Sequence, residues 1–218
     1  MQWTEKYRPL RLDNVVGNQK IVSELKKYAK LNVADLPNLL FYGPPGIGKT
    51  SSAYAFCFDG NHAFEDINSP QVNGKNDMDR FVYRLSQGAM ISNFETTEYE
   101  NGEHGTDGYI IVFDKAEMLT KQAQNVLEKA LESRTDAKSI FIANDVSNFT
   151  EPMLSRFTAF EFKPLHDEEI EKLLTEMARK ENLEVPDRIL NKIIEDAKGI
   201  PRSAITALEK YWIIEKQS

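Results

Sequence analysis

The sequence predicts an α/β fold, in which a parallel β-sheet is flanked by helices and followed by a small helical lid. Three observations support this prediction. Short apolar segments that end in glycine or a polar residue alternate with helix-forming segments. A glycine-rich turn joins the first such strand to a helix, and beyond Pro164 the pattern becomes entirely helical. We therefore expect an α/β domain over residues 1–163 and a helical lid domain over residues 164–218.

The composition is that of an ordinary globular protein, with 218 residues, 41% hydrophobic and 28% charged. The single cysteine, Cys57, excludes an internal disulfide. No segment is apolar enough for a transmembrane helix or a signal peptide, so we expect an intracellular protein, cytoplasmic or nuclear, without a membrane partner. The net charge of -7 argues against broad, nonspecific nucleic-acid binding, although a local basic surface remains compatible with it.

The first 30 residues predict an arm and a helix. Residues 3–19 have mixed polarity and contain Pro9, which predicts an extended arm that leads into a turn. From residue 20 to residue 30 the apolar side chains are spaced for one face of an amphipathic helix, and they are Ile21, Val22, Leu25 and Tyr28.

Residues 43–50 form the pattern G-x-x-x-x-G-K-[ST], which binds phosphate groups. Its glycines permit a tight turn, and the helix that follows offers free N–H groups and a positive dipole end to an anion. Lys49 adds an ammonium for the terminal phosphates, and the Thr50 hydroxyl suits a magnesium ion. A strand over 39–42 and helix-forming residues 51–56 provide the expected context, so a chance match is disfavoured. The predicted nucleotide contacts here are Gly43, Pro44, Pro45, Gly46, Ile47, Gly48, Lys49, Thr50 and Ser51.

This segment and the arm together resemble the start of a sliding-clamp loader ATPase subunit, the AAA+ group that includes replication factor C small subunits and their phage counterparts. The arm residues that carry the resemblance are Trp3, Glu5, Lys6, Tyr7, Arg8, Pro9, Val15, Val16 and Gly17. The resemblance implies an AAA+ fold with ATP and Mg²⁺ as cofactors. It also implies that Arg8 and Val16 lie near the nucleotide base, although a purely structural arm is an equal alternative for either residue.

Residues 64–72 predict a second buried strand, interrupted by Pro70, and residues 73–77 a turn. A helix is expected over 79–87 and a polar loop over 96–108. In clamp loaders the turn and helix lie near the central DNA chamber, so the resemblance makes Lys75, Arg80 and Arg84 candidates for DNA phosphate contacts. A solvated helix face is the alternative.

Residues 109–114 predict a central parallel strand that delivers Asp114 to magnesium at its carboxyl end. The wider family usually has glutamate at the next position, where it orients or deprotonates the attacking water, but this chain has Lys115. A lysine ammonium cannot accept that proton, so ATP hydrolysis in this chain's own site is doubtful, whereas ATP binding is not affected. Glu117 is an alternative acceptor, although its position three residues further on need not bring it to the same place.

Residues 120–132 predict an amphipathic helix. The resemblance makes its Lys121 and Lys129 candidate DNA-facing or intersubunit groups, with plain surface exposure as the alternative. A buried strand over 139–144 ends in Asn144, which matches the sensor position of this ATPase class, where an amide contacts the terminal phosphate or the attacking water.

Residues 152–157 are similar to the Ser-Arg-Cys segment of clamp loaders, with Phe157 in place of the cysteine. The resemblance implies that Arg156 reaches into a neighbouring subunit's ATP site; a local ion pair is the alternative. After a strand over 158–163, helices are expected over 166–180, 186–198 and 202–216. Residues 199–202 resemble the second sensor, which implies that Arg202 couples lid position to the bound nucleotide.

The leading functional prediction is an ATP-binding subunit of a clamp-loader-like complex. Its predicted partners are other clamp-loader subunits, a sliding clamp and primer-template DNA. The predicted catalytic residues are Lys49, Asp114, Asn144, Arg156 and Arg202, with Thr50 and Asp114 as magnesium ligands. Two alternatives remain, a non-hydrolysing nucleotide-switched scaffold and a helicase loader or related replication ATPase. Clamp-loader subunits continue into a helical collar, which these 218 residues do not include.

Overall fold

A computed structural model describes residues 1–71, 76, 78–79, 82, 109–133 and 137–216, and every structural statement below concerns those residues. Their strands are β1 (Asn38–Tyr42), β2 (Ala63–Asn68), β3 (Tyr109–Asp114), β4 (Ala137–Ala143) and β5 (Phe157–Glu161). Their α-helices are α1 (Trp3–Lys6), α2 (Gln19–Tyr28), α3 (Lys49–Asp59), α5 (Lys121–Ser133), α6 (Glu151–Leu154), α7 (Asp167–Lys180), α8 (Asp187–Ala197) and α9 (Pro201–Glu215).

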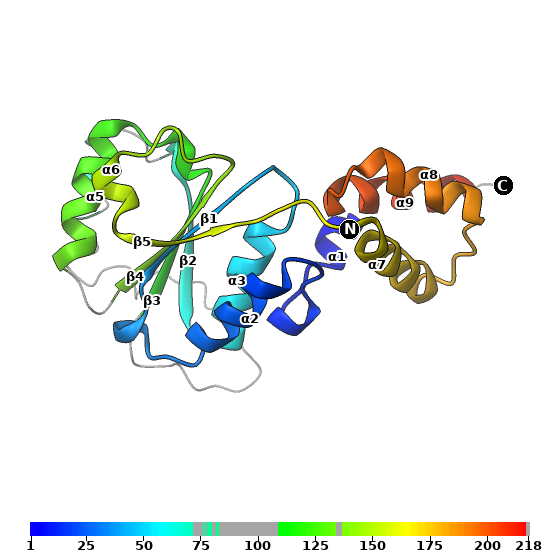
Figure 1. Ribbon diagram of the computed structural model, residues 1–218, viewed down its shortest axis with the longest axis horizontal. Coiled ribbons are helices and arrows are strands. Elements are labelled where there is room, and N and C mark those ends of the chain that lie inside the picture. Colours follow the sequence, from blue (N-terminus) through cyan, green and yellow to red (C-terminus); the bar gives the residue numbers. More distant parts are fainter. Residues whose placement is uncertain (72–75, 77, 80–81, 83–108, 134–136, 217–218) are drawn as a thin grey trace.

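The strands form one parallel sheet in the order β2-β3-β4-β1-β5 (Figure 1). Because all strands run the same way, their carboxyl ends share one edge, where ligands bind in open α/β sheets. Since β3, β4 and β1 are neighbours in the sheet, the residues that follow them lie side by side at that edge. The predicted α/β class and parallel sheet are confirmed.

Alternating strand residues cover the two faces of the sheet. Leu39 and Phe41 of β1 pack with α2 and α3 in one buried cluster, whereas Leu40 packs with α5 and α6 in another. Figure 1 shows these helices on opposite sides of the sheet. Burial on both faces explains why the strands read as continuous apolar segments rather than as alternating ones.

The lid helices α7, α8 and α9 share a third buried cluster, which also contains Trp3 of α1. The Trp3 ring lies 5.4 Å from that of Trp212, and its backbone N–H donates to Glu209 Oε1 at 3.1 Å. The expectation of an extended arm from residue 3 is therefore wrong at its start, where residues Trp3–Lys6 are helical. So short a helix is unstable alone, and its contacts with α9 stabilise it. Because α1 packs with the lid in this way, a division of the chain after residue 163 stays a prediction.

Several element boundaries differ from the sequence prediction. The strand expected over 64–72 ends at Asn68, because Pro70, which cannot donate to a strand ladder, lies in a 3₁₀ helix (Ser69–Gln71). Strand β4 ends at Ala143, so Asn144 follows the strand rather than closing it. The three lid helices are confirmed, each within a residue of its predicted ends.

Some predicted features lie outside the described residues, namely Lys75, Arg80, Arg84, the loop over 96–108 and most of the helix over 79–87. Within the described part of the chain, no helix combines the length and apolarity needed to cross a bilayer.

Candidate nucleotide-binding site

A cavity of about 380 Å³ lies at the carboxyl edge of the sheet and is also lined by residues of the arm and the lid. Its size is within the range of small-molecule sites. The predicted residues on its wall are Arg8, Val16, Pro45, Gly46, Ile47, Gly48, Lys49, Thr50, Ser51, Asp114, Asn144 and Arg202. Gly43 and Pro44 do not line it but accept hydrogen bonds from Lys49. Arg156 is not on its wall.

Lys49 is the buried cation of the site. Its Nζ donates to the carbonyl oxygens of Gly43 at 2.7 Å and Pro44 at 2.9 Å, and to Asn144 Oδ1 at 3.2 Å. Burial lowers the pKa of Lys49 to about 8, with Arg202 acting in the same direction, while Glu117 and Asp114 oppose the shift. A bound phosphate would favour the charged ammonium, because an anion close to a cation stabilises its protonated form.

The lid contacts the phosphate loop at Gly46. The backbone N–H of Arg202 donates to the Gly46 carbonyl at 3.2 Å. A Cβ atom on Gly46 would lie 3.0 Å from Ile200 Cγ2 and 3.1 Å from Arg202 Cβ, and the residue has a φ of +80°. Glycine is required here for two reasons. Other residues would be strained at this positive φ, and their Cβ atom would clash with Ile200 and Arg202 of the lid. The start of α9 thus rests on the loop that is expected to hold the phosphates.

Replacing Gly46 by alanine is expected to displace the lid and to weaken ATP binding about tenfold, because a left-handed alanine costs about 1–2 kcal/mol and its methyl group meets Ile200. A fluorescent ATP analogue would measure the affinity, and spin labels on α2 and α9 would report the lid position. Gly48→Ala is the matched comparison, since Gly48 also has a positive φ but an added Cβ would meet nothing within 4 Å. Equal lid displacement in both variants would contradict the assignment of this contact.

Thr50 and Asp114 both line the cavity, at the start of α3 and the end of β3. No cluster of three or more metal-binding His, Cys, Asp or Glu side chains occurs among the described residues. One carboxylate and one hydroxyl nevertheless fit Mg²⁺, which is typically held by one or two protein ligands together with substrate phosphates and waters. The donor set is therefore compatible with magnesium bound jointly by this chain and a nucleotide.

Asn144 bridges the cation and a carboxylate. Its Oδ1 accepts from Lys49, and its Nδ2 donates to Glu117 Oε1 at 2.6 Å. Glu117 therefore lies on the cavity wall, although its sequence position left this open. The cause is the backbone at Lys115, which has φ 55° and ψ 43° and starts a 3₁₀ helix (Ala116–Met118). This turn at the end of β3 directs the chain back toward the cavity.

Residues of the arm, α3 and the lid also line the cavity. The Arg8 guanidinium lies 5.3 Å from the centre of the Tyr54 ring and pairs with Glu5 at 2.7 Å. Tyr54 donates to Asp66 Oδ2 at 2.7 Å, and burial raises the pKa of both groups. Sequence reasoning missed the cavity-lining side chains Tyr54, Leu173 and Ile205. They carry no local signal, because each reads as an ordinary position on a helix.

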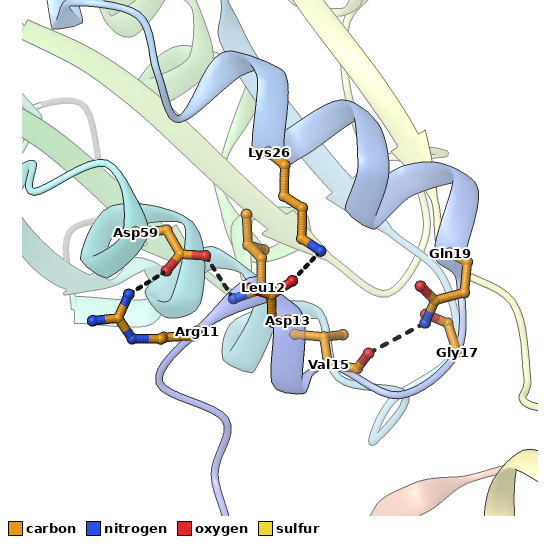
Figure 2. A network of polar contacts seen from close by, with 8 residues as sticks. All are labelled: Arg11, Leu12, Asp13, Val15, Gly17, Gln19, Lys26 and Asp59. Atoms are coloured by element: carbon orange, nitrogen blue, oxygen red, sulfur yellow. Dashed lines mark hydrogen bonds and ion pairs between the residues drawn. The ribbon is translucent and has the colours of Figure 1, made fainter.

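Polar contacts fix the arm against α2 and α3 (Figure 2). The backbone N–H of Leu12 donates to Asp59 Oδ2 at 2.8 Å, and Arg11 pairs with the same carboxylate at 3.6 Å. Gln19 Nε2 donates to the Val15 carbonyl at 3.4 Å, and Lys26 pairs with Asp13. These contacts hold the backbone that places Val15 and Val16 on the cavity wall.

Arg156 lies away from this cavity and pairs with Glu128 at 3.0 Å, while its guanidinium also donates to the Pro152 carbonyl. The local ion pair considered as an alternative is thus present, and a role in a neighbouring subunit stays a prediction. Lys121 donates to the Asn148 carbonyl at 2.6 Å, which ties α5 to the loop after β4. Lys129 is exposed on α5.

Comparison with known proteins identifies relatives of this chain. Residues 39–165 match the model of the ATPase family associated with various cellular activities (AAA). The chain is 34% identical to human replication factor C subunit 4 and 33% identical to the replication factor C small subunit of Picrophilus torridus, over 95% of its own length in each case. It covers 57% and 63% of those two relatives, so it spans about three fifths of their length.

Solved structures support the fold independently. The Thermotoga maritima RuvB Holliday junction branch migration motor superposes with a TM-score of 0.73 at 20% sequence identity. The match covers 93% of this chain and 64% of that protein. At this identity the likeness concerns the fold alone.

Proposed function

This chain belongs to the ATPase family associated with various cellular activities (AAA), and on that premise we propose that it is an ATP-binding subunit of a clamp-loader complex. Such a complex would load a DNA polymerase sliding clamp onto primer-template DNA. One observation carries the proposal. Four side chains from separate segments, Lys49, Asp114, Asn144 and Arg202, meet in one cavity lined by both the sheet edge and the lid. The replication factor C relatives support the choice of clamp loading among the activities of the family.

Lys49, Asp114 and Arg202, together with Thr50, have distinct roles in the proposed site. The phosphate loop and the start of α3 would bind the phosphates through backbone N–H groups, and Lys49 would contact the terminal phosphates. Thr50 and Asp114 would hold magnesium, which neutralises phosphate charge when bound. Arg202 comes from the lid and also contacts the loop through its backbone, so nucleotide binding and lid position are expected to be coupled.

The proposed partners are neighbouring clamp-loader subunits, a sliding clamp and primer-template DNA, in an intracellular setting. Arg156 would act on the ATP site of the neighbour, where a guanidinium stabilises charge on the transferred phosphoryl group. Its position outside this chain's own cavity supports such a role, because Arg156 does not line the site that this chain itself would use.

Native mass measurement tests the proposal most directly. The chain, candidate neighbouring subunits, a sliding clamp and primed DNA would be mixed with and without a non-hydrolysable ATP analogue. We expect a complex that contains the chain and the clamp only when the analogue is present. Failure of the chain to bind the analogue, or a clamp complex that forms equally well without it, would contradict the proposal.

Lys115 favours a second candidate function, a nucleotide-switched scaffold that binds ATP without acting as an efficient ATPase. A lysine at this position cannot accept a proton from water while it is charged, and it lines the cavity near the expected phosphates. Steady-state ATP hydrolysis with clamp and primed DNA separates the two candidates. A scaffold would assemble without stimulated turnover.

The variant Lys115→Glu is expected to raise ATP turnover by about tenfold or more, because it supplies a proton acceptor and removes a positive charge at the position that the family uses. Phosphate release measures turnover, and titration with an ATP analogue should show unchanged affinity. Lys192→Glu, which makes the same charge change at an exposed position of α8, serves as the control. Unchanged turnover in Lys115→Glu with intact nucleotide binding would count against this account of Lys115.

A further inference from the structure

Glu117 is brought to the cavity by a backbone conformation that its sequence position does not suggest. Strand β3 ends at Asp114, and the left-handed conformation of Lys115 is followed directly by the 3₁₀ turn Ala116–Met118. A left-handed conformation is unfavourable for a residue with a side chain. The turn nevertheless places Glu117 on the cavity wall together with Asp114, Lys49 and Asn144.

The two carboxylate oxygens of Glu117 have different surroundings. Oε1 accepts from Asn144 Nδ2 at 2.6 Å, and Asn144 in turn accepts from Lys49, so the carboxylate is connected to the buried cation through the sensor amide. Oε2 is buried and has no hydrogen-bond partner in the described part of the chain. A buried polar atom without a partner is rare in folded proteins and calls for a specific explanation, such as a catalytic role or a bound water.

The other carboxylates on the described cavity wall have separate tasks. Asp114 accepts from the Lys115 backbone N–H and is the expected magnesium ligand at the end of β3. Glu5 pairs with Arg8, whose guanidinium lies over the Tyr54 ring. Glu117 is thus the carboxylate that lies next to both Lys49 and Asn144, where the terminal phosphate of a bound nucleotide is expected.

We propose that Glu117 is the catalytic residue that orients and deprotonates the attacking water in this chain's own ATP site, in place of the glutamate that Lys115 replaces. This inference rests on the proposed function. The water oxygen forms a bond to the γ-phosphorus, and the bond from that phosphorus to the β–γ bridging oxygen breaks, leaving its electron pair on ADP. The water proton passes to the Glu117 carboxylate, which then returns it to the phosphate product.

The wild-type chain is expected to hydrolyse ATP slowly, at a rate that depends on Glu117. The variant Glu117→Gln retains a carbonyl oxygen that can accept from Asn144 but cannot take up a proton. We expect it to reduce the single-turnover hydrolysis rate by about a hundredfold, which is within the usual contribution of a general base, and to change ATP affinity by less than about twofold. Glu176→Gln, the same change at an exposed residue that pairs with Lys180, should have no effect.

A double variant separates catalysis from a structural role. Lys115→Glu introduced into Glu117→Gln should restore hydrolysis, because it supplies a carboxylate at the usual family position. Wild-type hydrolysis no faster than that of Lys49→Met would overturn the inference. Unchanged hydrolysis in Glu117→Gln, or a loss of ATP affinity as large as the loss of rate, would overturn it as well. A wild-type chain that fails to bind an ATP analogue at all would instead contradict the proposed function itself.

Discussion

Replacing Lys49 by methionine is expected to weaken ATP binding about a hundredfold while leaving the fold intact. The ammonium donates three hydrogen bonds inside the site and is the buried cation of the cavity. Loss of one charged contact to phosphate costs about 3 kcal/mol, which corresponds to about a hundredfold in affinity. Titration with a fluorescent ATP analogue measures the effect. An affinity within about threefold of wild type would contradict the placement of phosphate beside Lys49.

The same variant should change how stability depends on pH. Because the pKa of Lys49 is lowered to about 8 by burial, the unfolded chain binds more protons at this position than the folded chain between about pH 8 and 10.5. The unfolding free energy of the wild type should therefore rise with pH in that window relative to Lys49→Met, by roughly 3 kcal/mol in total. Denaturant unfolding of both proteins across this window measures the difference. Parallel stability curves would contradict the lowered pKa.

Replacing Arg156 by alanine is expected to leave this chain's own ATP affinity unchanged and to reduce hydrolysis in the assembled complex about a thousandfold, the low end of what an arginine finger contributes. The reason is geometric. The Arg156 guanidinium lies outside this chain's own cavity, against Glu128 and the Pro152 carbonyl. Its removal should therefore slow hydrolysis at a neighbouring nucleotide site rather than at this one. Hydrolysis would be measured in the complex, and affinity in the isolated chain.

A mixing experiment makes this prediction specific to neighbouring sites. Arg156→Ala retains an intact ATP site, and Lys49→Met retains an intact arginine, so an assembly that contains both should recover part of the hydrolysis that each lacks alone. Glu128→Gln is the matched control, because it breaks the same ion pair but keeps the guanidinium, and it should hydrolyse ATP at least as fast as wild type. If Glu128→Gln lost as much activity as Arg156→Ala, the ion pair rather than the guanidinium would be the important feature. That result would contradict a role of Arg156 in a neighbouring site.

The features that the sequence predicted well are those determined by neighbouring residues, by a motif or by a regular pattern. The apolar segment before Gly43, the phosphate loop and the helix after it lie within about 20 residues and form as expected. The strand that ends at Asp114 was predicted correctly, whereas Asn144 lies one residue beyond the end of β4 instead of closing it. Both residues still lie at the same edge, because the carboxyl ends of parallel strands meet there. The lid helices were predicted from the helical pattern that begins beyond Pro164.

The features that were missed depend on contacts between distant parts of the chain. The sequence of the first residues predicts an extended arm, yet Trp3–Lys6 form a helix. This helix is stabilised because Trp3 contacts the Trp212 ring and the Glu209 carboxylate of α9. Tyr54 of α3 and Leu173 of α7 line one cavity only because the tertiary fold brings these two helices to it. No local sequence pattern encodes these contacts between distant segments.

The sequence alone determined the α/β class, the phosphate loop, the candidate magnesium ligands and the absence of the usual glutamate at position 115. Each of these depends on neighbouring residues or on a regular spacing. Only the tertiary structure decided that Glu117 reaches the cavity, that Arg156 does not, and that the lid rests on Gly46. The physical reason differs for each position. A backbone turn at Lys115 places Glu117, the ion pair with Glu128 holds Arg156, and the docking of α9 on the phosphate loop places the lid.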